Sequence, residues 1–84
     1  MTPIQQLLNR IRHDKEFGEG RFEIGYFDRA EGIIHRVAFQ EIVFPAGERR
    51  AFELLDESGQ PRRIPFHRVR EVYKDGQRIW RRLG

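Results

Sequence analysis

Residues 64–82, IPFHRVREVYKDGQRIWRR, contain the clearest folding signal of the chain. Asp75-Gly76 is its strongest turn signal, because both residues tolerate the positive φ angles of a type I′ turn. On either side of this dipeptide, apolar and polar side chains alternate, as they do in half-buried strands. The pattern predicts a hairpin that pairs Tyr73 with Arg78 and Val72 with Ile79. Trp80 and Ile79 then point to opposite faces of the sheet.

Pro65 interrupts the segment that leads into this hairpin. Residues 51–55 and 62–66 should pair with each other as an earlier hairpin that turns at Ser58-Gly59-Gln60. The predicted pairs are Leu54 with Ile64 and Phe52 with Phe66. Because proline cannot donate a ladder hydrogen bond, we expect the second arm to be an edge or to carry a bulge near His67. Such a bulge would re-aim His67 and Arg68.

The N-terminal half predicts one helix followed by one hairpin. Thr2 is the expected cap of a helix that starts at Pro3. Its apolar stripe is Ile4, Leu7, Leu8 and Ile11. Residues 21–29 alternate as a strand, and a tight turn at Glu31-Gly32 would set Tyr26 against Val37 in the next strand. Residues 40–44 fit either a strand or a short helical turn.

These elements predict the α+β class, with one N-terminal helix packed on a strongly bent antiparallel β-sheet or on a small open barrel built from hairpins. The 84 residues allow one domain, spanning 1–84, with one small core. No signal peptide or apolar run of roughly 20 residues is present, so we expect a cytoplasmic protein without a membrane partner. The absence of cysteine excludes disulfides and thiolate metal sites.

Positive charge is concentrated near the C-terminus. Residues 62–82 carry eight lysines and arginines against two carboxylates, for a net charge of +6, whereas the rest of the chain sums to −3. Most of these cations are arginines, whose planar guanidinium matches two phosphate oxygens at once. The segment therefore favours binding of nucleic acid or another phosphorylated ligand, with a merely solvated hairpin face as the alternative.

Trp80 and His67 are the other candidate groups in this segment. Trp80 either belongs to the core or, if exposed beside Arg82, stacks a base. His67 either hydrogen-bonds within a strand end or presents a neutral imidazole to a ribose or phosphate ester oxygen. The sequence leaves both choices open.

Asp28 and Arg29 occupy the end of the predicted strand over residues 21–29. Asp28 either pairs with His35 or caps the turn, and Arg29 joins a phosphate site only if the sheet curls towards His67. The histidines, including His13, are too far apart in sequence to predict a metal site. There is no phosphate-binding glycine loop, so we predict neither a metal nor a cofactor.

Four motifs carry a family resemblance: Leu8-Asn9-Arg10-Ile11-Arg12, Tyr26-Phe27-Asp28-Arg29, Ile64-Pro65-Phe66-His67-Arg68-Val69 and Trp80-Arg81-Arg82. From about Ile4 to Arg82 the chain resembles the small RNA cyclic group end recognition domain. One departure is His13, which stands where the family carries tryptophan. The resemblance implies recognition of RNA ends bearing a 2′,3′-cyclic phosphate, and it points to motif positions Asp28, Arg29, His67, Arg68, Trp80 and Arg81.

We therefore expect a binding module for RNA 3′ ends in RNA repair or processing, and not an enzyme. The expected RNA- and phosphate-binding residues are Arg29, His67, Arg68, Trp80, Arg81 and Arg82. Family members are associated with RNA ligases, cyclic phosphodiesterases and nucleotidyltransferases, so such enzymes are the expected protein partners. Two alternatives remain open: a cyclic phosphodiesterase with His67 as general base assisted by Asp28 or His35, and an adaptor that docks on an RNA-processing enzyme.

Overall fold

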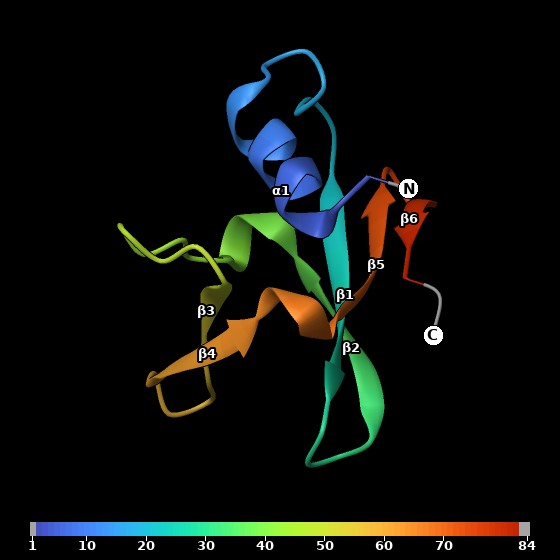
Figure 1. The fold of residues 1–84 in the computed structure, drawn as a ribbon. Coiled ribbons are helices and arrows are strands. Elements are labelled where there is room, and N and C mark those ends of the chain that lie inside the picture. The colour runs from blue at the N-terminus through green and yellow to red at the C-terminus, as the bar shows by residue number, and fades with distance from the viewer. Residues whose placement is uncertain (1, 83–84) are drawn as a thin grey trace.

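A ten-residue helix opens the chain. In the computed structural model, which describes residues 2–82, α1 spans Ile4–His13 (Figure 1). Its buried side chains are the four predicted, Ile4, Leu7, Leu8 and Ile11. The predicted cap is wrong: the N-cap is Pro3, whose carbonyl accepts the first helical hydrogen bond from the Leu7 amide at 3.1 Å. No helix within residues 2–82 is long and apolar enough to cross a bilayer.

Four antiparallel strands form the main sheet, in the order β2-β1-β5-β6. Their bounds are Phe22–Asp28 for β1, Ile33–Ala38 for β2, Val69–Lys74 for β5 and Gln77–Arg81 for β6. Between β2 and β5 in the chain, β3 (Ala51–Leu55) and β4 (Pro61–Pro65) pair as a separate two-stranded sheet. The α+β class with one N-terminal helix is therefore confirmed, and the strands divide into two sheets without closing a barrel.

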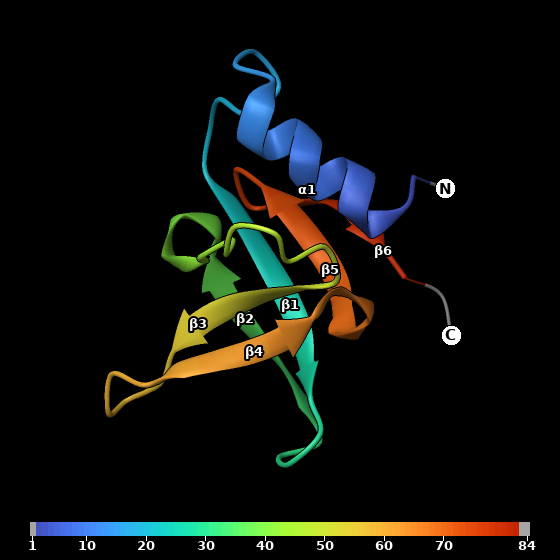
Figure 2. The ribbon, with the colours of Figure 1, turned by 60° about the vertical axis from the view of Figure 1, so that its left-hand side comes forward.

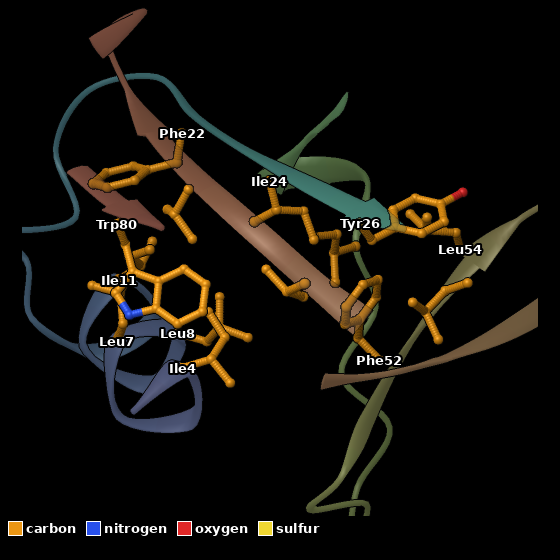
Figure 3. Packing of buried hydrophobic residues seen from close by; sticks show 14 residues of the cluster. Ile4, Leu7, Leu8, Ile11, Phe22, Ile24, Tyr26, Phe52, Leu54 and Trp80 are labelled. Atoms are coloured by element: carbon orange, nitrogen blue, oxygen red, sulfur yellow. The ribbon is translucent and has the colours of Figure 1, made fainter. Parts of the chain in front are cut away.

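The core lies between these layers. Figure 2 shows α1 and the β3–β4 hairpin on the same side of the four-stranded sheet. Phe52 from the hairpin and Ile24, Val69 and Val72 from the sheet are fully buried. Trp80 packs beside the apolar stripe of α1 (Figure 3). One face of the main sheet is thus covered by the helix and the hairpin.

The segment between β2 and Pro45 contains a helical turn and a strand-like contact. The 3₁₀ turn η1 spans Phe39–Glu41. Val43 then forms an isolated antiparallel bridge with Glu53, with backbone hydrogen bonds of 2.9 and 2.8 Å. Both interpretations of residues 40–44 therefore hold for part of the segment, and the bridge ties it to β3.

The β1–β2 hairpin has a longer turn than predicted. Asp28 pairs with Ile33 across four turn residues, and its carboxylate accepts hydrogen bonds from two turn amides at 2.9 and 3.2 Å. These bonds stabilise a wider turn than a two-residue type I′ loop. Tyr26 consequently faces His35, and the predicted pairing with Val37 is wrong. The shift of two residues leaves every side chain on its predicted face.

The β3–β4 hairpin shifts in the same way. Phe52 faces Ile64, and the predicted pairing with Phe66 is wrong. The Asp56 carboxylate accepts two loop amides at 2.9 Å each, and this closes a longer loop than expected. Phe66 is released from the ladder and begins the 3₁₀ turn η2, Phe66–Arg68.

A bulge in the β5–β6 hairpin positions Trp80. Asp75-Gly76 forms the expected turn, with φ angles of 51° and 83°. The pairing next to the turn is as predicted, but the register then shifts so that Val72 faces Trp80. The predicted pairing of Val72 with Ile79 is therefore wrong. The extra residue turns the indole into the core beside Val72 and leaves Ile79 exposed, whereas the predicted pairs would have placed Ile79 beside Val72.

Candidate functional site

Arginines from distant parts of the chain surround one hollow beside the start of α1. It has a volume of about 400 Å³. Its lining residues are Pro3, Ile4 and Gln5 from the N-terminal region, Arg49 and Arg50 from the loop before β3, Phe66 and His67 from η2, and Arg82. We call it the arginine hollow. It brings together two of the predicted site residues, His67 and Arg82.

Pro65 and η2 place His67 at this hollow. The edge alternative holds for β4, which pairs only with β3 among the described strands. Pro65 ends β4 and is the N-cap of η2, so the chain leaves the ladder through a 3₁₀ turn and not a bulge. The Phe66 amide donates to the Arg50 carbonyl at 2.7 Å, and the Phe66 ring stacks on Phe52 with centroids 6.1 Å apart. This anchoring sets η2 against the loop that carries Arg50, while His67 itself is exposed.

Glu48 orders that loop without bringing a carboxylate into the hollow. Its Oε1 accepts the Arg50 amide at 2.9 Å and the Arg63 guanidinium at 3.2 Å. The hydrogen bond from the Arg50 amide is the largest cause that lowers the pKa of Glu48, and the Arg63 hydrogen bond adds to it. The carboxylate is therefore engaged elsewhere, and the side chains of Arg49 and Arg50 are both exposed.

Arg82 is the fixed cation of the hollow. Its Nε donates to the Val69 carbonyl at 2.9 Å, and its Nη2 lies 3.4 Å from the Phe66 carbonyl. Its guanidinium carbon lies 5.2 Å from the centre of the Trp80 ring. Burial lowers the pKa of Arg82, and the charge of Arg70 lowers it further. An arginine still stays protonated in proteins, so these contacts hold a permanent charge in one place.

The first turn of α1 adds backbone donors to the same hollow. The first amides of a helix have no partner within it, and they carry the positive end of the helix dipole. Among the described residues, no side chain caps this end and the first turn contains no acid. The amide end is held in place because the Thr2 carbonyl accepts the Trp80 indole N–H at 2.7 Å.

Trp80 therefore has a structural role. Only 7% of its surface is exposed, and its single polar group is bonded to Thr2. Base stacking required an exposed ring, so burial favours the core alternative. The indole supports the hollow from beneath through Thr2 and Arg82.

The other predicted arginines do not line the arginine hollow. Arg29 is exposed in the β1–β2 turn, and Arg81 is exposed on β6 opposite Glu71. Arg68 follows His67 in η2, where its Nε is buried without a hydrogen-bond partner among residues 2–82. The structure thus brings His67 and Arg82 together and leaves Arg29 and Arg81 outside.

A second hollow, of about 590 Å³, lies beside the turn of the β3–β4 hairpin. Its charged lining residues are Asp28, Glu31, His35, Glu41, Asp56, Glu57 and Arg62. We call it the carboxylate hollow. His35 Nε2 lies 3.4 Å from Asp28 Oδ2 and 3.3 Å from Glu31 Oε2, so Asp28 both caps the turn and pairs with His35.

Asp28 is the buried acid of this hollow, with 4% of its surface exposed. The amide of Glu31 is the largest cause that lowers the pKa of Asp28, and Arg62, 3.9 Å away, contributes by its charge. Ligand atoms of Asp28, Glu31 and His35 lie within 4.8 Å of one another, which is close enough to hold a cation. Their contacts with the turn and with one another explain this arrangement without a metal.

The two hollows have no described lining residue in common. His67 therefore lies in a different hollow from both Asp28 and His35, the two groups considered as partners in acid–base chemistry. General acid–base catalysis needs both groups within reach of one substrate. The described structure does not bring these groups together.

Sequence reasoning missed Arg49, Arg50 and the first turn of α1. The available signal was the pair of adjacent arginines after Gly47 and Glu48 in a loop. They lie outside the basic segment, and only the pairing of Phe66 with the Arg50 backbone brings them to His67.

Arginines, a histidine and the first amides of a helix, gathered here around one hollow, are groups that bind phosphate in many proteins. A comparison with known families identifies the family of the chain. The chain belongs to the MJ1316 RNA cyclic group end recognition domain family, whose model matches residues 1–82. The family name implies recognition of RNA ends that carry a cyclic group. Neither the curated proteins nor the solved structures contain a significant match.

His13, where the resemblance predicts a tryptophan, lies away from the arginine hollow. His13 is the exposed last residue of α1, whereas the hollow lies at the first turn. The substitution therefore leaves the lining of the hollow unchanged.

Proposed function

We propose that the arginine hollow binds RNA 3′ ends that carry a 2′,3′-cyclic phosphate, in RNA repair or processing. The observation that carries the proposal is the convergence of Arg49, Arg50, Arg82 and His67 on one hollow. The family match supports RNA ends as the ligand class. Partner enzymes such as an RNA ligase, a phosphoesterase or a nucleotidyltransferase would act on the bound end.

Selectivity for the cyclic group has to come from geometry. A cyclic phosphodiester carries one negative charge, whereas an open terminal phosphate carries about −1.5 to −2 at neutral pH. Positive charge alone would therefore favour the open form. Arg82 and the amides of α1 are held by the fold, so they offer donors with fixed directions. We assign them to the phosphate oxygens and His67 to the ester or ribose oxygen.

Arg49 and Arg50 add adjustable charge at the rim of the hollow. Hydrogen bonds to charged groups contribute roughly 1.5–3 kcal/mol each, which corresponds to about tenfold to a hundredfold in affinity. Arg68 lies in the same turn as His67 and belongs to the proposal as an additional phosphate ligand. Arg68→Ala tests that assignment directly.

The test measures affinity for matched RNAs that end in a cyclic phosphate, an open phosphate or a hydroxyl. We expect the cyclic end to bind most tightly and Arg49→Ala and Arg50→Ala each to weaken it by about tenfold or more. Lys15→Ala is the matched control, because it removes one exposed charge beyond the far end of α1. Equal affinity for all three ends would overturn end recognition.

Binding without turnover is part of the proposal. The separation of His67 from Asp28 and His35 supports it, because His67 lacks these groups as catalytic partners. Incubating the protein with a cyclic-ended oligonucleotide and analysing the end tests this point. Conversion to an open phosphate would show hydrolysis and overturn the binding-only role.

Salt titration separates RNA binding from an adaptor role on a protein. Each phosphate neutralised on a single strand releases counterions, so the affinity should fall steeply with salt. A flat salt response would contradict RNA as the ligand.

A further inference from the structure

The four-stranded sheet has an outer face opposite α1 and the β3–β4 hairpin. Phe27 projects there because Tyr26 and Asp28, its neighbours on β1, are buried on the inner side. Its other prominent side chains are Ile34 and Arg36 from β2, Tyr73 from β5, and Arg78 and Arg81 from β6. We call this surface the outer face. It combines aromatic rings with arginines on one side of an antiparallel sheet.

Arginines and aromatic rings on the outer face lie against one another. The guanidinium carbon of Arg36 lies 3.7 Å from the centre of the Tyr73 ring, which is stacking distance. That of Arg70 lies 5.7 Å from the centre of the Phe27 ring. Planar guanidiniums and aromatic rings are the groups on which unpaired bases stack. The alternation of the two types extends over neighbouring strands.

Gly25 leaves room for neighbouring side chains in the middle of the outer face. A Cβ atom at Gly25 would lie 2.9 Å from Ile34 Cγ2 and 3.3 Å from Glu71 Oε1. The missing side chain therefore allows Ile34 and Glu71 to close over the central strand.

The carboxylates of the outer face already have partners. Glu23 pairs with Arg36 at 2.7 Å, and Glu71 pairs with Arg78 at 3.1 Å. Arg70 and Arg81 add two further charges without a matching acid on this face. The charge that remains is positive, which complements a phosphate backbone. Ile34 on this face and Ile79 on the edge strand β6 are 44% and 41% exposed, so arginines outnumber the large exposed aliphatic side chains here.

The outer face is continuous with the arginine hollow. Arg70 lies over Phe27 on the outer face, while its Nη1 donates to the His67 carbonyl at 2.7 Å. Arg81 on the outer face is followed directly by Arg82 in the hollow. A chain that leaves the hollow past His67 or Arg82 would therefore meet the outer face next.

We propose that the single-stranded RNA leading to the bound end crosses the outer face, with a base stacked on Phe27 and phosphates on Arg70 and Arg81. This inference rests on the proposed function of the arginine hollow and extends it to the nucleotides upstream of the end. It makes the protein a reader of single-stranded RNA near its end, and the hollow a reader of the end itself.

A length series tests this inference. Cyclic-ended RNAs of two and of about ten nucleotides, the latter within the range of single-strand binding sites, are compared by fluorescence anisotropy. We expect the longer RNA to bind about tenfold or more tightly. Phe27→Ala and Arg81→Ala should each weaken the longer RNA by about fivefold and leave the dinucleotide unchanged. Phe27→Tyr keeps the ring and should keep the affinity, which separates stacking from a loss of folding.

Arg49→Ala distinguishes the two proposals, because it should weaken both RNAs. Equal affinity for short and long RNAs, with Arg49→Ala still harmful to both, would overturn the role of the outer face and leave the hollow intact. It is also the result expected if a protein covers the outer face. No effect of Arg49→Ala on either RNA would overturn the proposed function itself.

Discussion

The two hollows lie at opposite ends of the β3–β4 hairpin and carry opposite charge. The arginine hollow lies where the hairpin opens, beside Arg50 and Phe66, and the carboxylate hollow lies beside its turn. Each contains one histidine. His35 lies between two carboxylates at 3.3 and 3.4 Å, whereas His67 shares its hollow with three arginines. The same residue type is therefore placed in two opposite electrostatic environments.

The difference shows that the fold separates acidic from basic side chains even where they are neighbours in the sequence. Glu48 directly precedes Arg49, yet its carboxylate pairs with Arg63 and the backbone of Arg50 and does not line the arginine hollow. Arg62 begins the basic C-terminal segment, yet it lines the carboxylate hollow. The effect of a substitution on RNA binding should therefore depend on which hollow the side chain lines and not on its place in the sequence.

Trp80→Ala should have the largest effect on stability, because the side chain is buried. Its hydrogen bond to Thr2 also links it to the arginine hollow and not to the carboxylate hollow. Truncating a buried tryptophan costs roughly 3–5 kcal/mol of unfolding free energy. Trp80→Phe should cost less, yet it removes the indole donor that holds the Thr2 carbonyl. RNA affinity should therefore fall in both variants. Thermal unfolding and RNA binding measure the two effects separately.

In Trp80→Phe the carboxylate hollow provides the internal control. The turn capped by Asp28 has no contact with Thr2 in the described hydrogen bonds. Its amide exchange protection should stay unchanged. Loss of protection at both hollows would show that the indole stabilises the fold as a whole.

Replacing each histidine by alanine should affect RNA affinity in one variant and stability in the other. His67→Ala should weaken the cyclic-ended RNA by about threefold to tenfold, the value of one hydrogen bond. Since His67 is exposed, the unfolding free energy of the His67→Ala variant should hardly differ from that of the parent. His35→Ala should leave RNA affinity unchanged and lower stability slightly, because it removes the partner of Asp28 and Glu31. The opposite assignment of effects would move the RNA site to the carboxylate hollow.

The sequence predicts which side chains of β1 share a face of the sheet, but it does not predict which residues pair between neighbouring strands. Alternation groups Phe22, Ile24 and Tyr26 on one face of their strand, and all three are buried, because a slip of two residues does not change the face. The slips arose because Asp28 and Asp56 accept turn amides, which lengthens both loops. The bulge beside Val72 had no sequence signal at all, yet it decides that Trp80 is buried.

The candidate site was predictable only in part for a different reason. His67 and Arg82 belong to the segment that composition and motifs single out. Arg50 reaches them through a backbone hydrogen bond to Phe66, a long-range contact that no local pattern encodes. The segment before α1 depends in the same way on Trp80, whose indole N–H reaches the Thr2 carbonyl from the other end of the chain.

Acid should destabilise the protein partly through the carboxylate hollow. The pKa of Asp28 is lowered in the folded chain below its usual value of 3.8, so its ionised form stabilises the fold at higher pH. That contribution is lost as the pH falls below 3.8 towards the lower folded pKa. Asp28→Asn should therefore be less stable than the parent at neutral pH, with the difference narrowing in acid. Urea unfolding at pH 7 and pH 3 measures it, and a constant difference would contradict the prediction.

Arg62→Ala should have the smallest effect. It removes the same charge as Arg50→Ala, and both arginines are exposed. The Arg62 side chain is 47% exposed and lies 3.9 Å from Asp28, so its loss should cost no more than about 0.2–1 kcal/mol of stability. RNA affinity should stay within about twofold, against tenfold or more for Arg50→Ala. If the two variants weaken RNA equally, binding follows net charge and not the arginine hollow, because only one of these two arginines lines it.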